Sequence, residues 1–384
     1  MDSNPILNPA VMLAPGEDGY VAYNPIADTL HRLNPLASLI VELCDGTRSV
    51  NDIAELLAPL NMEGGAEAIE SWAGQGMAAG LLVRPEDATR VLTAEELSEL
   101  GRRLEARGDL QPSFLCRKRV AELTPDDTNA WYALGNVAFY LGKREEAREA
   151  YAKYLEFRPG DARLATVMAA LKDEAPPTRA PDECIQQIYR GFSVGYDTVM
   201  REELDYRSPE HVWTMVETVM GGREGLKALD LGCGSGLAGV HLRVRAKQLV
   251  GVDLSPEMVA LANARAIYDR LDVAEIGAWL ERNEKAFDLI VACEVLVYFG
   301  DLLPIMRAVA QHLTQGGVFV FTVERGEEPG YRLTDWGRYV HDASYIQDAA
   351  KRAGLSVERI EEAFLRLEYG APVTGLIVAL KKPH

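Results

Sequence analysis

The C-terminal half of the chain alternates short apolar runs with stretches whose apolar residues recur at helical spacing. A run that is apolar throughout is typical of a strand buried on both faces, and the intervening stretches are typical of amphipathic helices. Strand and helix in alternation predict a Rossmann-like α/β sheet. A late hairpin would complete a seven-stranded mixed sheet. The predicted strands are 228–231, 249–252, 268–273, 287–292, 318–322, 365–369 and 374–380, and the predicted helices begin near 235, 255 and 305.

The first part of the chain has a different order of patterns. Two short alternating segments, 20–23 and 28–33, predict strands, and three amphipathic stretches follow, at 34–43, 49–57 and 66–78. Ser49 stands where a helix N-cap is expected. The closing apolar segment is 80–83. Strands followed by three helices predict a small winged-helix-like α+β domain.

The middle of the chain repeats itself. Gly101 and Gly135 are 34 residues apart, and so are Pro125 and Pro159. The second repeat resembles the tetratricopeptide family in Trp131, Leu134, Gly135, Ala147, Tyr151 and Pro159. The resemblance implies two short helices per repeat, and a third helix is predicted from 162. Because stacks of this kind usually need three or more units, we expect a helical spacer, with a peptide-binding groove as the alternative.

Composition bounds the class of protein. The 384 residues carry a net charge of −18, which disfavours binding to nucleic acid or to an anionic membrane surface. Five scattered cysteines without C-x-x-C spacing indicate a reducing compartment and no structural metal. We find neither a signal peptide nor an apolar run long enough to span a membrane, so we expect a cytoplasmic protein. The expected domains are 1–92, 93–178 and 179–384, with a linker at 176–181.

The most informative motif is the turn after the first strand of the C-terminal part. It reads Asp230-Leu231-Gly232-Cys233-Gly234-Ser235-Gly236, and Asp253 ends the next strand. Glycines let a ligand approach the backbone closely, and an acid at the end of the second strand can accept hydrogen bonds from a ribose diol. The spacing is G-x-G-x-G, which differs from the dinucleotide pattern, and no phosphate-binding loop occurs. A nucleoside ligand without a pyrophosphate is therefore predicted.

The motif resembles the first motif of class I S-adenosylmethionine-dependent methyltransferases. The resemblance implies S-adenosylmethionine as cofactor, with S-adenosylhomocysteine as product. It places Asp230 near the amino group of the cofactor, Cys293 near its methionine part and Glu275 near the adenine. The implied cofactor-binding residues are Tyr189, Tyr196, Asp230, Gly232, Cys233, Gly234, Gly236, Asp253, Leu254, Met258, Glu275, Ile276 and Cys293. Met258 and Leu254 could instead be plain core residues.

Segments on either side of this motif resemble a bacterial subgroup of methyltransferases that carry tetratricopeptide repeats. They include Ile188–Asp197, Leu204–Pro209, Glu294–Leu302 and Gly337–His341. The resemblance covers about residues 94–382. This chain departs from the subgroup in having Glu294 where Asp is common and Ile188-Tyr189 where Phe-Asp is common. The subgroup's motifs do not fix a substrate.

The phrase Leu33–Ile53, together with Gly80-Leu81-Leu82, resembles the PqqD-like family over roughly residues 18–84. In that family the domain binds the leader of a ribosomally made precursor peptide, which adds as a strand to a sheet edge. Here the implied surfaces lie near Thr29–Leu33 and Glu67–Ala78. The alternatives are a domain that only packs on its neighbour, or one that binds DNA, which the acidic charge disfavours.

The acceptor chemistry is left open by the sequence. If the nucleophile carries a proton, a base helps, and His341 is the first candidate because its ordinary pKa suits transfer near neutrality. Glu294 and Tyr298 are the alternatives, and His341 could equally be structural. If the acceptor is a carboxylate, no base is needed, and Arg338 or Arg366 could orient it. Tyr339 and Tyr345 complete the expected substrate-binding residues.

The expected function is methylation of a precursor peptide whose leader is held by the N-terminal domain. The alternatives are an enzyme that methylates a small molecule or a folded protein, and a non-catalytic scaffold that binds peptides. The intact motif from Asp230 to Gly236, together with Asp253, argues against the scaffold. The oligomeric state is not predictable from these patterns.

Overall fold

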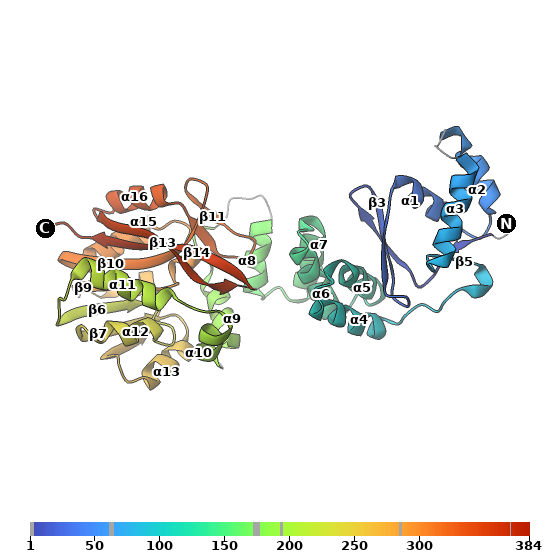
Figure 1. Ribbon diagram of the computed structural model, residues 1–384. Helices are drawn as coiled ribbons and strands as arrows, with labels where there is room; N and C mark the ends of the chain where they lie inside the picture. The colour runs from blue at the N-terminus through green and yellow to red at the C-terminus, as the bar shows by residue number, and fades with distance from the viewer. Residues whose placement is uncertain (1–3, 61–64, 172–176, 193–194, 284–285, 369) are drawn as a thin grey trace. The chain divides into compact units, whose positions relative to one another are not determined.

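The computed structural model describes residues 4–60, 65–171, 177–192, 195–283, 286–368 and 370–384. The chain forms two compact units, Met1–Arg158 and Pro159–His384 (Figure 1). The tetratricopeptide helices thus belong to the first unit by their contacts, whereas the three-part division at 92 and 178 stays a prediction. No helix among the described residues is long and apolar enough to cross a membrane.

The N-terminal unit begins with a three-stranded antiparallel sheet in the order β2-β3-β4. The helices follow as expected. The side chain of the N-cap Ser49 accepts a hydrogen bond from Asp52 N, and the carboxylate of Asp52 accepts one from Ser49 N, which completes a capping box. The sequence patterns missed β1 and β2, because β1 has only two residues and β2 ends in a Pro-Gly pair that is more typical of a turn. The bounds are β1 Ile6–Leu7, β2 Met12–Gly16, β3 Gly19–Asn24, β4 Thr29–Leu33, α1 Pro35–Leu43, α2 Val50–Leu57, α3 Gly65–Ala78 and β5 Leu82–Val83.

Four antiparallel helices continue this unit and form the two predicted repeats. Gly135 lies so close to Tyr151 that a Cβ at this glycine would overlap the ring, which explains glycine at this offset. The helices also contact the small sheet: α5 packs on β2, and Arg107 pairs with Asp28 at 3.1 Å. The repeats and the sheet are therefore one body. The bounds are α4 Ala94–Ala106, α5 Leu110–Leu123, α6 Thr128–Tyr140 and α7 Arg144–Phe157.

The C-terminal unit is built on one twisted sheet with the order β11-β12-β10-β9-β6-β7-β8. β14 inserts antiparallel beside β10, and β13 pairs with β14. Strand order reverses between β6 and β9, so the carboxyl ends of β6, β7 and β9 meet at the switch point where open α/β sheets bind ligands. The bounds are β6 Leu226–Leu231, β7 Ala246–Asp253, β8 Arg270–Val273, β9 Phe287–Ala292, β10 Leu313–Arg325, β11 Tyr331–Leu333, β12 Tyr339–His341, β13 Ser356–Glu368 and β14 Ala371–Lys381.

The expectation of seven strands needs correction, because the described sheet has nine. The two additional strands are β11 and β12, and β12 pairs parallel with the far end of β10 at Glu324 and Arg325. His341 lies outside every strand predicted from the sequence, and the structure places it in β12. The first strand of the predicted hairpin ended on Tyr369, and the predicted linker began on Pro176; both residues lie outside the described ones.

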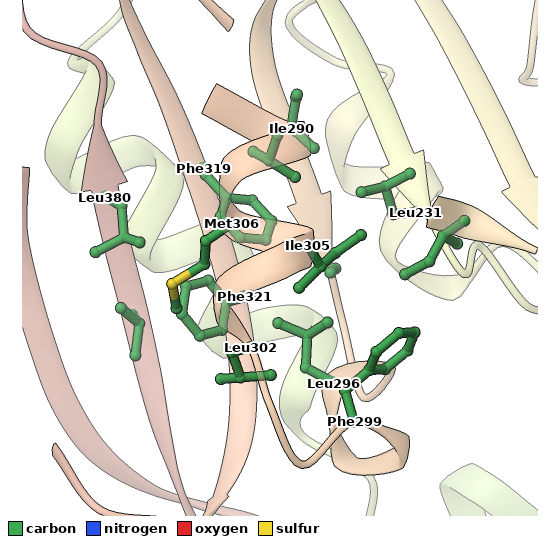
Figure 2. Close-up of a cluster of buried hydrophobic side chains, with 14 of the residues drawn as sticks. Leu231, Ile290, Leu296, Phe299, Leu302, Ile305, Met306, Phe319, Phe321 and Leu380 are labelled. Carbon is green, nitrogen blue, oxygen red and sulfur yellow. The ribbon is translucent and has the colours of Figure 1, made fainter. Parts of the chain in front are cut away.

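Helices cover both faces of this sheet, as in a doubly wound fold. On one face α11 and α12 pack on a cluster that includes Val216, Leu226 and Val320. On the other face Ile305 and Met306 of α15 pack on Ile290, Phe319 and Phe321 (Figure 2). The helices are α8 Ala162–Leu171, α9 Asp182–Phe192, α10 Tyr196–Thr198, α11 Ser208–Met220, α12 Leu237–Leu242, α13 Pro256–Ala264, α14 Ile276–Arg282, α15 Leu303–His312 and α16 Ala343–Arg352, with short turns η3 Val199–Glu203 and η4 Leu296–Tyr298.

Candidate active site

A cavity of about 810 Å³, open solvent included, lies at the switch point of the C-terminal sheet. It collects residues from the ends of three strands and from the helical segments before the sheet. Its lining comprises Arg179, Ile185, Tyr189, Tyr196, Tyr206, Asp230, Gly232, Cys233, Gly234, Ser235, Leu237, Ala238, Asp253, Leu254, Glu275, Ile276, Cys293, Glu294, Val295, Tyr298 and Phe299.

The glycine turn forms one wall of the cavity. Gly232 has a φ of +66° and lies against Val295, where a Cβ would overlap a methyl group. Gly234 has a φ of +53° and has nothing within 4 Å of the place of its missing Cβ. Only glycine adopts both conformations without strain, and at Gly234 its small size leaves space beside the backbone.

Asp253 closes this wall from the end of β7. Its Oδ2 accepts a hydrogen bond from Gly234 N at 2.8 Å, and its Oδ1 accepts one from Ser255 N at 2.9 Å. Burial raises the pKa of this carboxyl, while the backbone donors oppose the rise. The carboxylate is thus fixed by the turn, with lone pairs left to accept hydrogen bonds from a diol.

Asp230 is the most unusual polar group of the site. It is 1% exposed, and its Oδ2 accepts a hydrogen bond from Tyr268 Oη at 2.7 Å. Its Oδ1 is buried and has no partner among the described residues. Burial raises the pKa of Asp230 to about 7, and the Tyr268 hydrogen bond opposes that rise. A buried acceptor without a donor costs free energy, so this atom indicates a place for the cation or donor of a ligand.

Four further residues of the lining are tyrosines. Tyr189 and Tyr298 join their hydroxyls at 3.1 Å, and the rings of Tyr189 and Tyr196 lie 6.3 Å apart. Tyr206 contacts Cys293 Sγ through its hydroxyl at 3.4 Å. Faces of aromatic rings attract cations, so these tyrosines suit a positively charged ligand.

The donor set fits S-adenosylmethionine. The orphaned Asp230 Oδ1 suits the ammonium group, Asp253 suits the ribose diol, and the open space at Gly234 leaves room for a close approach. Glu275 lines the cavity but already caps α14 and accepts a hydrogen bond from Arg179 at 3.2 Å. The residues that would hold the cofactor therefore come from β6, β7, β9 and the segment before α14.

The structure brings most of the predicted cofactor residues together on this lining. The exceptions are Gly236 and Met258, which are not on the lining. Arg265 and Tyr268 lie close to the place where a Cβ of Gly236 would stand, and Met258 is fully buried. Met258 therefore matches the alternative of a plain core residue. The assignment of roles to the lining residues stays a proposal.

His341 does not lie where a catalytic base was expected. Its ring is fully buried and packs against the rings of Tyr331 and Tyr345, its Nε2 lies 3.0 Å from Gly300 O, and it is not part of the cavity lining. Desolvation lowers the pKa of His341 to about 4. Because His341 lies outside the cavity lining and its pKa is lowered, the structure gives no support to His341 as the base, and that role stays a prediction.

The predicted substrate residues are also engaged elsewhere. Tyr339 is buried and donates to Pro177 O, and Tyr345 donates to Asp301 at 3.0 Å. Arg338 and Arg366 pair with carboxylates and do not line the cavity. Glu294 and Tyr298, by contrast, are both on the lining.

Several lining residues were missed by the sequence analysis. Tyr206 and Val295 lie in segments that resemble the methyltransferase subgroup, but the resemblance does not assign a role to either residue. Arg179 lay in a stretch that composition indicated as a linker, and nothing in its sequence surroundings pointed to the site. The others missed are Ile185, Ser235, Leu237, Ala238 and Phe299.

Comparison with known proteins agrees with this geometry. Residues 229–319 match the family described as methyltransferase domain, 128–161 match the tetratricopeptide repeat, and 10–69 match the family of coenzyme PQQ synthesis protein D, PqqD. The ubiquinone biosynthesis O-methyltransferase of Leptothrix cholodnii is 30% identical over 116 residues, which are 29% of this chain and 49% of the relative. The same-named protein of Bordetella pertussis is 26% identical over 162 residues, 36% of this chain and 66% of the relative. The chain thus spans about half to two thirds of the length of these relatives.

Two solved structures show a similar arrangement at low identity. One is the complex between the Haloferax volcanii Trm112 methyltransferase activator and the putative methyltransferase, with 21% identity, 52% of this chain and 98% of that chain covered, and a TM-score of 0.44. The other is a Burkholderia thailandensis 1,6-didemethyltoxoflavin-N1-methyltransferase with bound S-adenosylhomocysteine. It has 17% identity, with 55% of this chain and 94% of that chain covered, and a TM-score of 0.43. Nothing about the substrate follows from likeness at this level. Residues 229–319 of this chain therefore match a methyltransferase domain family.

Proposed function

We propose that this protein transfers a methyl group from S-adenosylmethionine to an acceptor that enters the cavity beside Glu294 and Tyr298. The observation that carries the proposal is that the cavity is lined by Asp230, whose buried Oδ1 has no partner among the described residues, and by Asp253, which is held by the glycine turn of the same wall. Asp230 could hold the amino-acid tail of the ligand in this cavity while Asp253 holds its ribose.

The residues of the chain would work by orientation and exclusion of water. When bound, S-adenosylmethionine would supply a methyl group attached to a sulfonium. The sulfur leaves as a neutral thioether, so no acid is needed. Asp253 and Asp230 fix the two ends of the ligand, and Tyr189 and Tyr196 cover its charge. Of the two proposed bases on the lining, Glu294 is the one able to take a proton from an acceptor, because burial raises the pKa of Tyr298 and keeps its hydroxyl protonated.

Calorimetric titration with S-adenosylhomocysteine, followed by transfer of a labelled methyl group from S-adenosylmethionine, tests this core of the proposal. We expect one ligand per chain and a labelled product. Absence of binding by the full chain would remove the cofactor assignment, whereas binding without any labelled product would leave a cofactor-bound scaffold.

The N-terminal unit supports a peptide as the acceptor-bearing substrate. It matches the PqqD family over residues 10–69, and its sheet has β4 at one edge with no described strand beyond it. Leu30 on β4 is 40% exposed. At the opposite edge β2 is contacted by α5. An incoming extended segment could therefore add to β4 by strand pairing, with Leu30 offering an apolar contact.

A candidate precursor encoded beside the gene for this protein, expressed together with it, tests the peptide assignment. We expect its mass to rise by one methyl group in place of hydrogen. Leu30→Asp should abolish the modification, because a charge on the edge strand opposes docking of an apolar segment. Leu56→Asp, which changes an exposed leucine of α2 in the same unit, is the matched control and should modify the precursor normally. Equal loss in both variants would point to a general folding defect.

A small-molecule acceptor is the second candidate, because the ubiquinone biosynthesis relatives match the methyltransferase part. Under this alternative Leu30→Asp would leave turnover on a phenolic acceptor unchanged and no peptide would be labelled. Transfer to a phenolic quinone precursor in the absence of any peptide would favour it.

A further inference from the structure

Five charged side chains, two of them buried and three partly buried, lie together beside the cavity. Arg366 of β13 is 3% exposed and contacts three carboxylates: Glu294, Glu324 at 2.6 Å and Glu368 at 3.3 Å. Arg338 pairs with Glu324 at 3.4 Å and with Glu368 at 3.3 Å. Two guanidinium groups thus face three carboxylates, so one negative charge is left over when all are ionised.

Glu294 is the member of this cluster that reaches the cavity. Its backbone has a φ of +59°, a left-handed conformation that side chains other than glycine adopt at a cost. Glu294 N donates to Thr322 Oγ1 at 2.8 Å, and Ser208 Oγ donates to Glu294 Oε1 at 3.2 Å. A strained backbone that is held by hydrogen bonds at a cavity wall is typical of a functional position.

The arginines of the cluster are not available to an anionic substrate. Both are paired inside the protein, and the one guanidinium on the described lining is that of Arg179. Arg179 itself pairs with Glu275 at 3.2 Å and with Asp182. An acceptor carboxylate in the cavity would therefore face Glu294 and the acids of the cofactor wall without a free cation, and like charges at close range repel strongly in a dry site.

We infer that the methyl acceptor is a proton-bearing nucleophile, a hydroxyl or an amine rather than a carboxylate, and that Glu294 takes its proton; this inference rests on the proposed function. The O–H or N–H bond breaks and its proton goes to a carboxylate oxygen of Glu294. The electron pair of the nucleophile forms the bond to the methyl carbon, and the carbon–sulfur bond breaks with its pair remaining on sulfur. Arg366 is a positioning residue that holds the Glu294 carboxylate.

The electrostatics of the cluster agree with this role. Burial raises the pKa of Glu294 to about 7 and that of Glu324 to about 8, while Arg338 opposes both shifts. The cluster thus exchanges a proton with its surroundings close to neutrality, and Glu294 becomes a working base as the pH rises through about 7. The groups that face Glu294 are Ser208, Thr322, Glu324, Arg338, Arg366, Glu368, Tyr196, Tyr206, Tyr298 and Cys293.

Infrared difference spectroscopy of the full chain bound to S-adenosylhomocysteine tests the proton exchange without turnover. We expect a protonated-carboxyl band that disappears as the pH rises through about 7 to 8 in the wild type. In Glu294→Gln, which removes the excess negative charge, the part of the band that comes from the cluster should be absent, whereas the part that comes from Asp230, whose pKa is also raised to about 7, should remain. Glu362→Gln, which changes an exposed glutamate of β13, is the control and should keep the whole band. A band of unchanged intensity and pH dependence in Glu294→Gln would overturn the role of Glu294.

The chemistry of the labelled product tests the acceptor class. Methyl esters release methanol in mild alkali, whereas methyl ethers and methylamines keep their label. We expect the label to be kept, and its release as methanol would overturn the inference. Glu294→Gln should lower kcat by about 10²-fold or more near pH 7 while the affinity for S-adenosylhomocysteine stays within about twofold. A variant with wild-type kcat would also contradict it. If no acceptor is labelled at all, the proposed function fails, and the infrared result still decides whether Glu294 exchanges the proton.

Discussion

The two carboxylate-bearing walls of the cavity are built in different ways. On the glycine-turn wall, Asp230 keeps an unpartnered Oδ1, and Asp253 is held by two backbone donors. On the Glu294 wall, Arg366, Ser208 and Thr322 hold the Glu294 carboxylate. The first wall has a buried acceptor whose donor a ligand could supply, whereas the second has its partners within the protein. One wall is therefore built to bind a ligand, and the other to fix the orientation of the carboxylate that we propose as the base.

The Glu294 wall should therefore depend most on its own partners. Replacing Arg366 with methionine leaves Glu294, Glu324 and Glu368 buried without their main cation, and we expect the free energy of unfolding to fall by about 3–5 kcal/mol. Denaturant unfolding measures the change. Arg352→Met removes an exposed pair with Asp348 and should change stability by less than about 0.5 kcal/mol. Equal losses in the two variants would refute the idea of a self-contained charge cluster.

The glycine-turn wall should respond through ligand binding. Asp253→Ala removes the expected ribose acceptor and leaves Gly234 N without its partner, so S-adenosylhomocysteine should bind more weakly by about 1–3 kcal/mol. Calorimetry measures this affinity, and Asp348→Ala, which changes an exposed residue in the middle of α16, serves as the control. An unchanged affinity in Asp253→Ala would contradict the assignment.

The same wall should make binding depend on pH. The pKa of Asp230 is raised to about 7 by burial, so the carboxyl is mostly neutral below that pH and mostly ionised above it. An ammonium group needs the ionised form, so affinity should rise as the pH increases, by about tenfold between pH 6 and pH 8. Asp230→Asn should bind weakly with a flat profile. An affinity for S-adenosylhomocysteine that is higher at pH 6 than at pH 8 would contradict this prediction.

His341 of β12 belongs to neither wall of the cavity. Because it is buried against Gly300 and outside the cavity, His341→Leu should lower stability by about 1 kcal/mol and leave the affinity for S-adenosylhomocysteine unchanged. Turnover should persist, in contrast to Glu294→Gln. Loss of turnover in a folded His341→Leu variant would restore the histidine as a base.

The same contrast explains what the sequence could and could not predict. Asp230, Gly232, Gly234 and Asp253 lie within one strand–turn–helix–strand stretch, so their spacing alone places them together. The N-terminal strands β3 and β4 and its three helices were likewise predictable from local periodicity and from the Ser49 cap.

The Glu294 cluster was not predictable in this way. Its members come from the end of β9, from β10, from the segment before β12 and from β13, and their meeting depends on β14 inserting between β10 and β13. Local patterns identified Arg338 and Arg366 as polar groups near the site without showing that they are already paired. His341 was misplaced for the same reason, because its burial in the short strand β12, between β11 and β10, has no local signature.

A crystal structure of the full chain with S-adenosylhomocysteine tests the central claim most directly. The account predicts the ribose hydroxyls on Asp253, the ammonium group within hydrogen-bonding distance of Asp230 Oδ1, and Glu294 facing open space in front of the sulfur. A ligand bound elsewhere, or an Asp230 Oδ1 that still lacks a partner in the complex, would contradict it.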